Sequence, residues 1–477
     1  MRDYMFSAVA RSGSRVQLWI VGVFLIALFS LFPGGCSSLG YATTTSTTPA
    51  QFNAFWQQGS AAAFSQWTLS GVTLNSNSKV LTSSTSPSSP ASPALQLTPS
   101  KMRQTCSASD IDGGKASYNA SMGLCSGHDP VTAGSYNNGL NYYNGGNFYF
   151  GTAVSPMITP AHPINAVVVS WNAVTPVGTW LEVHVRAQQG GQWTHWYQLP
   201  IWASSFDAIH RHSVDGQSDA GGSISTDTYN TGAQNATAYQ IGLTLFSNSP
   251  PVSPLVWRIT AIASYNNAKN VQVVPMDRSV WGKNLAVPQR SQMLSAYQGQ
   301  TYGGGGEVWC SPTSTSMVME YWSNVLKQTA LNQTVPNAAI GTYDFTYGGT
   351  GNWPFNTAYA GSFGLHAFVT RMYSLSQIEQ WIKVGVPIVI GIAYQKGQLP
   401  GSPISAGTDG HLLVIRGFAG NGDVITNDPA AATNAAVQII YPRSTFESLW
   451  QNGSNGITYV IYPENWTTPT VNALGSW

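Results

Sequence analysis

The sequence predicts a multi-domain protein in which an antiparallel β-sandwich of jelly-roll type precedes an α+β domain. The chain has 477 residues, which is more than one ordinary domain requires. Over 51–265, short strand patterns alternate with breaks rich in Gly, Asn and Pro, and no convincing amphipathic helix intervenes. Over 286–465, helical and strand patterns are mixed.

The first 42 residues have the pattern of an export signal. Three arginines precede an uncharged apolar run over 16–32, and small residues follow it. The small residues at 40–42 suit an ordinary signal peptidase, whereas Cys36 after two glycines resembles a lipoprotein site. An uncleaved anchor is a third alternative, because about 17 apolar residues are at the short limit for spanning a membrane. We therefore expect the protein to be secreted or held on the outer face of the cell envelope.

Composition limits the partners of the protein. The net charge is +1 and 8% of the residues are charged, so no basic patch is available for phosphates and nucleic acid is excluded. The glycine run 303–306 lacks the Lys and Ser/Thr of a phosphate-binding loop. We expect no cofactor and no metal. The membrane is expected to matter only through the signal or a lipid on Cys36.

Four further segments have the composition of linkers, loops or tails. Residues 43–50 and a loop near 78–100 are dominated by Ser, Thr, Pro and Ala. Such segments bury too little apolar surface to offset the entropy lost on ordering. The chain turns polar again over 266–285, where we place the domain boundary, and residues 466–477 form a tail.

Strand signals in the first module are short and frequent. The segment 179–186 alternates strictly, so its aliphatic residues face one side and Glu182, His184 and Arg186 face the other. Two further strands are expected at 166–171 and 238–245.

Two groups of residues in this module could bind ligands. Aromatic rings stack on sugars, and three tryptophans cluster near one strand: Trp193, Trp196 and Trp202. Ordinary packing is the favoured interpretation of that cluster. Carboxylates in a Gly/Ser-rich region could hold calcium, although they lack a dense alternating ligand pattern: Asp215, Asp219 and Asp227. A cell-wall glycan therefore remains a possible partner of the module.

The cysteines divide into three roles. Cys36 belongs to the export segment. Cys106 and Cys125 lie close together in a polar stretch and are expected to form a disulfide outside the cytoplasm. Cys310 is left without a partner, and an unpaired thiol in an exported chain is a candidate nucleophile. A buried core cysteine is the alternative.

The context of Cys310 favours catalysis. Apolar residues follow it at the spacing of a half-buried helix: Val318, Tyr321, Trp322, Val325 and Leu326. Pro312 suits the first helical turn. Cys310 therefore lies at the helix N-terminus, where unpaired amides stabilise a thiolate and lower the thiol pKa.

A histidine and an aspartate follow on one predicted hairpin. His411 begins a strand, the chain reverses near residues 420–421, and Asp428 returns to within one or two positions of His411. The carboxylate can then fix the imidazole tautomer. His366 lies in an apolar stretch and is expected to be structural. A chance surface position remains the alternative for Asp428.

Other elements complete a mixed α and β domain. Ser376 and Glu379 have the spacing of a capping box, which predicts the start of a helix that ends at Gly385. A strand is expected at 388–392.

An acyl transfer also needs donors directed at the developing oxyanion. Gln292 is the side-chain candidate, with the backbone N–H of Cys310 as the second donor. Spacing alone leaves three rivals: Gln289, Gln298 and Gln300.

Residues 286–463 resemble the bacteriocin-processing-peptidase-like family of papain-clan cysteine peptidases. The similar stretches are Val287-Pro288…Ser291-Gln292, Trp309-Cys310-Ser311-Pro312-Thr313-Ser314, Gly410-His411-Leu412-Leu413-Val414 and Asn427-Asp428-Pro429. The resemblance implies an α+β papain-like fold, with Cys310 as nucleophile, His411 as base, Asp428 as orienter and Gln292 in the oxyanion hole. Residues 51–265 resemble the β-rich module of exported bacterial members. The roughly 17-residue separation of Gln292 from Cys310 exceeds that in many papain-like enzymes.

Three functions are consistent with these residues. The favoured one is an exported cysteine peptidase that hydrolyses a peptide or protein substrate through a thioester acyl-enzyme. The second is a cell-wall amidase or peptidoglycan endopeptidase that uses the same three residues. The third is a non-catalytic cell-surface binding protein in which the β-module carries the function.

Overall fold

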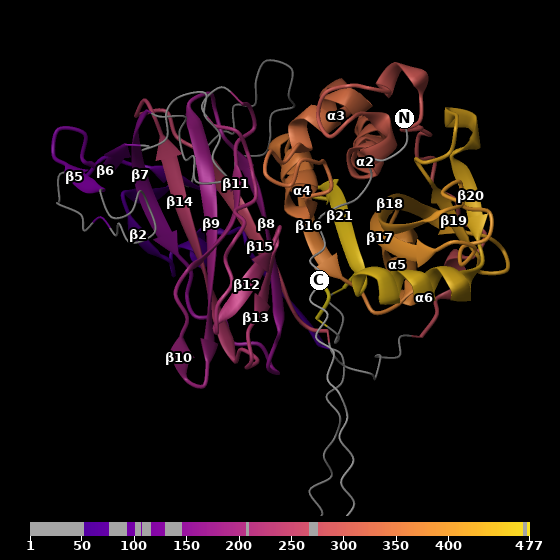
Figure 1. The fold of residues 1–477 in the computed structure, drawn as a ribbon, viewed down its shortest axis with the longest axis horizontal. Coiled ribbons are helices and arrows are strands. Elements are labelled where there is room, and N and C mark those ends of the chain that lie inside the picture. The colour runs from indigo at the N-terminus through magenta and orange to yellow at the C-terminus, as the bar shows by residue number, and fades with distance from the viewer. Residues whose placement is uncertain are drawn as a thin grey trace, which may run out of the picture. The chain divides into compact units, whose positions relative to one another are not determined.

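The strand segments of the N-terminal half pair into two antiparallel sheets (Figure 1). The structure is a computed structural model, and it describes residues 52–75, 93–100, 106, 116–128, 146–206, 209–266, 275–470 and 475–477. The predicted export signal and the 43–50 linker lie outside these residues. No helix in the described ranges combines the length and hydropathy that a membrane span requires.

The first sheet has the strand order β12-β13-β8-β15-β4-β3, and β1 also pairs with β15. Its strands are β1 (Phe52–Gln58), β3 (Val72–Asn75), β4 (Ala94–Leu97), β8 (Ala166–Val174), β12 (Gly222–Ser225), β13 (Thr228–Thr231) and β15 (Leu255–Tyr265). A four-residue helix, α1 (Ala61–Phe64), follows β1.

The second sheet has the order β10-β9-β14-β7-β6-β5, with β11 paired to β9 and β2 paired to β7. Its strands are β2 (Thr68–Ser70), β5 (Ser117–Asn119), β6 (Leu124–His128), β7 (Asn147–Val154), β9 (Thr179–Gln189), β10 (Gln192–Trp193), β11 (Tyr197–Trp202) and β14 (Ala238–Ser247). The predicted antiparallel β architecture is confirmed, as are the expected strands β8, β9 and β14. Jelly-roll topology stays a prediction.

Both faces of β9 are covered, which the alternating pattern did not indicate. Leu181, Val183 and Val185 belong to the main core, as expected. On the opposite face, Glu182 is fully buried and His184 is 7% exposed. The same face carries a second hydrophobic cluster, which contains Trp180, Phe150, Ile201 and Phe246. An additional layer therefore covers the face that the sequence predicted to be polar.

The C-terminal region is a mixed α and β domain around a six-stranded antiparallel sheet of order β16-β21-β17-β18-β19-β20. The strands are β16 (Leu365–Arg371), β17 (Ile388–Gln395), β18 (Gly407–Phe418), β19 (Val424–Asn427), β20 (Gln438–Tyr441) and β21 (Ile457–Pro463). The helices are α2 (Cys310–Leu326), α3 (Val335–Thr342), α4 (Trp353–Ser362), α5 (Leu375–Lys383) and α6 (Arg443–Ser454). Short 3₁₀ turns are η2 (Arg278–Val280), η3 (Ser295–Tyr297), η4 (Gly306–Val308), η5 (Thr329–Leu331) and η6 (Asn434–Ala436).

The expected 78–100 loop and the expected linker are partly ordered. Within the expected 78–100 loop, Ala94–Leu97 forms β4, because Ala94, Leu95 and Leu97 are apolar enough to be buried. At the end of the expected linker, Trp281 forms a bridge with Phe418 of β18.

The expected C-terminal tail is likewise held by the domain. Trp477 is 8% exposed, and its ring centroid lies 5.4 Å from that of Trp381 in α5. The backbone N–H of Phe55 donates to the Gly475 carbonyl at 2.6 Å. Composition identified the polar residues of the tail but not the aromatic residue that anchors it.

The predicted capping box is wrong. Helix α5 begins at Leu375, so Ser376 already lies inside the helix. Glu379 is fully buried instead of capping the helix, and its carboxylate accepts hydrogen bonds from Trp281 Nε1 and the Asp277 N–H. The glutamate therefore binds the segment before the domain to α5. Gly385, at φ 85°, follows the end of the helix as expected.

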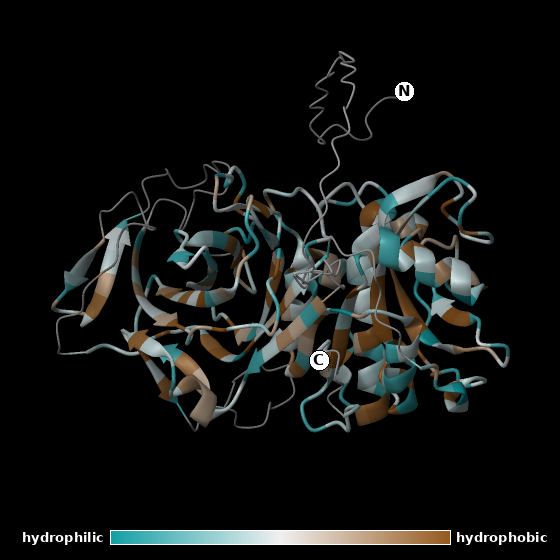
Figure 2. Ribbon diagram, turned by 90° about the horizontal axis from the view of Figure 1, so that it is seen from below, coloured by the Kyte–Doolittle hydropathy of each residue, from teal (hydrophilic) through white to brown (hydrophobic). Residues whose placement is uncertain are grey.

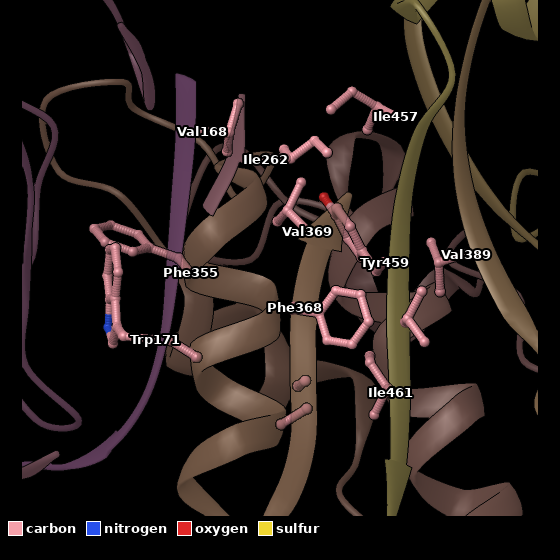
Figure 3. Close-up of a cluster of buried hydrophobic side chains, with 14 of the residues drawn as sticks. Val168, Trp171, Ile262, Phe355, Phe368, Val369, Val389, Ile457, Tyr459 and Ile461 are labelled. Atoms are coloured by element: carbon pink, nitrogen blue, oxygen red, sulfur yellow. The ribbon is translucent and has the colours of Figure 1, made fainter. Parts of the chain in front are cut away.

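Hydrophobic side chains from both halves of the chain pack into one cluster (Figure 3). Trp171 of β8 and Phe355 of α4 are both buried, and their ring centroids lie 6.4 Å apart. Trp202 of β11 approaches Phe355 to 5.3 Å. Within the C-terminal region, Figure 2 shows hydrophobic residues concentrated in the strands of the sheet. The β-module and the C-terminal domain therefore share a core.

Polar groups extend this junction. The Asn172 side-chain amide donates to the Ala367 carbonyl at 2.7 Å and accepts from the Ala367 N–H at 3.3 Å, which satisfies both atoms of a buried amide. The Val369 N–H donates to Ser170 Oγ at 2.9 Å. These bonds join β8 to β16.

We predict that Phe355→Ala destabilises the two halves together. Truncation of a buried Phe costs about 3–5 kcal/mol of unfolding free energy, and here the cavity opens between the module and the domain. Chemical denaturation followed by tryptophan fluorescence and by circular dichroism should give one transition shifted to lower denaturant concentration. Val325→Ala is the control, because Val325 is 40% exposed. A separate, unshifted transition of the β-module would contradict a shared core.

Candidate active site

Cys310 is the first residue of α2, and the helix that carries it is central to the domain. Residues 311–319 are all buried, because β18 contacts one side of the helix while α3 and α4 contact others. The sequence predicted only a half-buried helix, and that prediction holds only for the end near Val325. Cys310 itself is half-buried and is the free cysteine among the described residues. Its position gives the sulfur the field of the unpaired amides of the first turn.

The hairpin of β18 and β19 brings His411 and Asp428 together. Val414 pairs with Asn427, so Asp428 lies just beyond the end of the ladder, diagonal to His411. The Nε2 atom of His411 and the Oδ1 atom of Asp428 are 2.8 Å apart. Both side chains are buried, at 2% and 0% exposed. Nδ1 is then the ring nitrogen left to face Cys310.

The three groups perturb one another strongly. Burial alone would raise the pKa of the Cys310 thiol, but the hydrogen bond and the charge of His411 outweigh it, so that pKa is lowered. Burial alone would lower the pKa of His411, but the charge and hydrogen bond of Asp428 raise it to about 10. Burial alone would raise the pKa of Asp428, but the charge of His411 and the hydrogen bonds from His411, Tyr441 and the Ala430 N–H together lower it. The shifts of Cys310 and His411 are both in the direction that favours a thiolate beside an imidazolium.

Backbone and side-chain contacts fix the distance between α2 and β18. The backbone N–H of Leu412 donates to Cys310, which also lowers the thiol pKa. The Ser314 hydroxyl, one helical turn after Cys310, donates to the Leu412 carbonyl at 3.1 Å. Sequence reasoning missed Ser314, although its i+4 spacing from Cys310 is a signal that could have identified it.

Asp428 also accepts a hydrogen bond from a tyrosine that sequence reasoning missed. The buried Tyr441 hydroxyl donates to Asp428 Oδ2 at 2.8 Å, and the Ala430 N–H donates to Oδ1 at 3.0 Å. With His411, these bonds use both carboxylate oxygens. Tyr441 lies on β20, and the local sequence gives no signal for its contact with Asp428.

Gln292 lies between the segments that carry the nucleophile and the orienter. Its backbone N–H donates to the Pro429 carbonyl at 2.8 Å, and its Nε2 atom donates to the Glu307 carbonyl at 2.9 Å. Its Oε1 atom has no hydrogen-bond partner within the described ranges. One N–H of the amide remains after the bond to Glu307. Its role as an oxyanion donor stays a prediction.

The remaining candidates have separate environments. Cys106 and Cys125 form the predicted disulfide, with their Cα atoms 5.6 Å apart. His366 is buried in β16, its Nε2 atom lies 3.0 Å from Gln57 Oε1, and burial lowers its pKa. It takes no part in the Cys310 constellation.

The tryptophan cluster of the module divides in two. Trp202 is fully buried in the core. Trp193 and Trp196 are half-buried and lie on Arg186, whose guanidinium carbon is 4.7 and 4.6 Å from the two ring centroids. The burial of Trp202 agrees with the packing interpretation. Arg186 gives the rings of Trp193 and Trp196 a cationic partner.

Two of the three aspartates considered for calcium have different partners within the protein. Asp219 binds Tyr197 and His195, and Asp227 binds Thr228 and the backbone of Trp353. No group of three or more His, Cys, Asp or Glu residues suited to a metal occurs among the residues described.

Comparisons with known proteins match both halves of the chain. Residues 53–264 match the peptidase C39 N-terminal domain, and residues 284–457 match the peptidase C39-like family. No curated protein matches the chain.

Two solved structures are similar at a low level. A candidate C39-like peptidase from Bacillus anthracis has 14% identity and a TM-score of 0.27, over 39% of this chain and 98% of that one. The endo-1,4-β-D-xylanase 10B CBM22-1–GH10 modules from Clostridium thermocellum, complexed with xylohexaose, have 8% identity and a TM-score of 0.16, over 48% of this chain and 30% of that one. These TM-scores are too low to support a structural argument. The family assignment therefore depends on the two domain matches.

Proposed function

Because the chain belongs to the C39-like peptidases of the papain clan, we propose that it is an exported cysteine peptidase with Cys310, His411 and Asp428 as its catalytic triad. The proposal depends chiefly on the 2.8 Å hydrogen bond between His411 and Asp428, because the imidazole that it orients also lowers the pKa of Cys310. A buried imidazole held by a carboxylate on one side and a thiol on the other is what a sulfur nucleophile needs.

The proposed reaction proceeds through a thioester. The Cys310 thiolate attacks the carbonyl carbon of the scissile peptide bond, while His411 holds the thiol proton. The oxyanion accepts hydrogen bonds from the Cys310 backbone N–H and from the remaining N–H of Gln292. His411 then protonates the leaving amine, and the C–N bond breaks. Water, deprotonated by His411, attacks the thioester and releases the acid product and the thiol.

We predict that iodoacetamide alkylates Cys310 well below pH 8. The lowered pKa means that the thiolate persists until the pH falls through that pKa, whereas an ordinary thiol is mostly protonated below about 8.5. His411→Ala removes the group that lowers the pKa, so the alkylation midpoint should move to higher pH. Mass spectrometry of the modified peptide measures the rate.

His366→Ala is the matched control, because His366 is the other histidine of the C-terminal domain and contacts Gln57 instead of Cys310. Its pH profile should match that of the wild type. An alkylation midpoint near that of a free thiol, unchanged by His411→Ala, would refute an activated Cys310 and favour a non-catalytic binding protein.

The substrate separates the peptidase from the cell-wall hydrolase. Incubation with an unfolded protein and with purified sacculi, each compared with the Cys310→Ala variant, assigns the activity. New peptide termini in the protein alone favour the peptidase, and release of soluble muropeptides alone favours the amidase or endopeptidase.

Export is proposed on two grounds. Residues 1–42 have the pattern of a signal, and the Cys106–Cys125 disulfide suits an oxidising compartment. Secretion or anchoring at Cys36 would place the enzyme where peptides outside the cytoplasm are its substrates.

A further inference from the structure

The turn between α3 and α4 is built around the carboxylate of Asp344. Its Oδ1 atom accepts hydrogen bonds from the backbone N–H groups of Thr346 at 3.1 Å and Tyr347 at 3.0 Å. Its Oδ2 atom accepts from the Asn352 side-chain amide at 2.9 Å. Asp344 is fully buried, whereas Tyr347 is 54% exposed. The turn therefore presents a large aromatic side chain on a fixed backbone.

The β-module supplies the other contacts of this turn. The Ser213 N–H donates to Asp344 Oδ1 at 2.9 Å, and the Phe345 N–H donates to the Arg211 carbonyl at 3.1 Å. The rings of His210 and Phe345 stack with centroids 4.1 Å apart and planes at 13°. These residues precede β12 and belong to the module, so its backbone and one of its rings determine the conformation of a turn in the C-terminal domain.

A second contact from the module holds the start of α4. The buried carboxylate of Asp227 accepts a hydrogen bond from the backbone N–H of Trp353, the first residue of α4, at 2.8 Å. The turn and the helix that follows it are therefore attached to the module at both ends.

The opposite side of the turn lies against the segment that leads into Cys310. The Thr350 hydroxyl donates to the Val308 carbonyl at 3.3 Å. A Cβ atom at Gly303 would lie 3.5 Å from both Gly349 Cα and Val308 Cγ2. Val308 is 46% exposed and lies two residues before Cys310. Partial desolvation raises the pKa of Tyr347, and the charge of Cys310 raises it further, in keeping with this placement.

We propose that Tyr347 and Val308 form a contact for an aliphatic or aromatic side chain of the substrate beside Cys310, and that the β-module positions this contact through Arg211, Ser213 and His210. The inference rests on the proposed peptidase function and names its substrate class. Two large apolar side chains are exposed on neighbouring segments next to the nucleophile, where burial by a substrate side chain stabilises binding. The module is then a part of the substrate cleft.

The test compares reagents that share one chemistry and differ in side chain. Peptidyl chloromethyl ketones carrying Gly, Leu or Phe next to the reactive carbon form a sulfur–carbon bond with the Cys310 thiolate, and chloride leaves. The full chain should react with the Leu or Phe reagent about tenfold faster than with the Gly reagent. Tyr347→Ala should reduce this preference to about threefold or less, and Val308→Ala should reduce it by a smaller factor.

Iodoacetamide, which has no side chain, separates this inference from the proposed function. Its rate with Tyr347→Ala should stay within about twofold of the wild type, because the variant changes no group that activates the thiol. A wild type unreactive to iodoacetamide below pH 8 overturns the peptidase function itself. A reactive wild type without side-chain preference, or a Tyr347→Ala variant that keeps the preference, overturns only the proposed substrate contact at Tyr347 and Val308. The peptidase function would then stand.

The contribution of the module is tested from its own side. His210→Ala removes the ring that stacks on Phe345 and should reduce the preference for the Leu and Phe reagents while leaving the iodoacetamide rate unchanged. His210→Phe keeps an aromatic ring and should restore the preference. Ile440→Ala, at an exposed position on β20, is the control. If His210→Ala behaves like this control, the module does not position the turn.

Discussion

Replacement of Cys310 by alanine is expected to abolish hydrolysis, with a loss of kcat/KM on the order of 10⁶-fold. The substitution removes the only group that forms the thioester, and His411 with Asp428 cannot replace it. The fold should survive, because Cys310 is half-buried and its side chain fills little of the core. Release of new peptide termini from an unfolded protein, followed by mass spectrometry, measures the loss, and the unfolding transition checks the fold.

Cys310→Ser is the matched control for this experiment. It keeps the shape of the side chain but replaces a thiol of lowered pKa with a hydroxyl. Because that hydroxyl stays protonated, the variant should also be inactive. Hydrolysis at the wild-type rate by either variant would show that another group carries the chemistry. Retained binding of a cell-surface ligand by inactive variants would leave the binding function of the β-module open.

The sequence identifies the site because its residues depend on local signals. Cys310 begins a helix whose apolar spacing is visible, and the hairpin between His411 and Asp428 is short enough for its register to be inferred to within two positions. Register in a hairpin follows from the position of the turn. The bulge at Arg416 shifts the pairing but keeps Asp428 within reach of the imidazole.

The residues that hold the site depend on tertiary contacts and could not be predicted in this way. Tyr441 reaches Asp428 because β20 pairs with β19 after a connection that contains η6. Asp344 binds the β-module at Ser213, 131 positions earlier in the chain. No periodicity links such distant residues, and a tyrosine or an aspartate looks the same in a sequence whether it is solvated or buried.

The core shared by the β-module and the C-terminal domain could not be predicted from the sequence for the same reason. Helix and strand periodicity predicts which face of an element is buried, but not which neighbour covers it. Glu182, which the alternating pattern placed on a polar face, is fully buried, and so is the polar side chain of Asn172. The composition change near residue 266 indicated a boundary, whereas Trp171, Phe355 and Asn172 join the segments on either side of it. A boundary in sequence composition therefore need not separate two cores.

Replacement of Asp428 by alanine is expected to reduce kcat/KM by between about 10² and 10⁴-fold without abolishing it. The Asp428 charge raises the pKa of His411, and His411 in turn lowers the pKa of Cys310. Without the carboxylate the imidazole becomes neutral at lower pH, so the thiolate loses its partner. The alkylation midpoint should therefore move up by about one unit or more. Stopped-flow alkylation across pH 5–9 measures the shift.

Two controls separate this electrostatic role from a packing role. Asp423→Ala changes a carboxylate in the same hairpin, which binds Asn421 and the Arg443 backbone instead of His411, and it should leave the alkylation midpoint unchanged. Tyr441→Phe removes one hydrogen bond to Asp428 but keeps the ring and the carboxylate charge, so it should lower activity less than Asp428→Ala and shift the midpoint by less. A loss of activity in Asp428→Ala with no shift in the midpoint would mean that the carboxylate only supports the fold. A shift that follows the removal of charge, and then of the tyrosine bond, would assign to Asp428 the control of the charge state shared by Cys310 and His411.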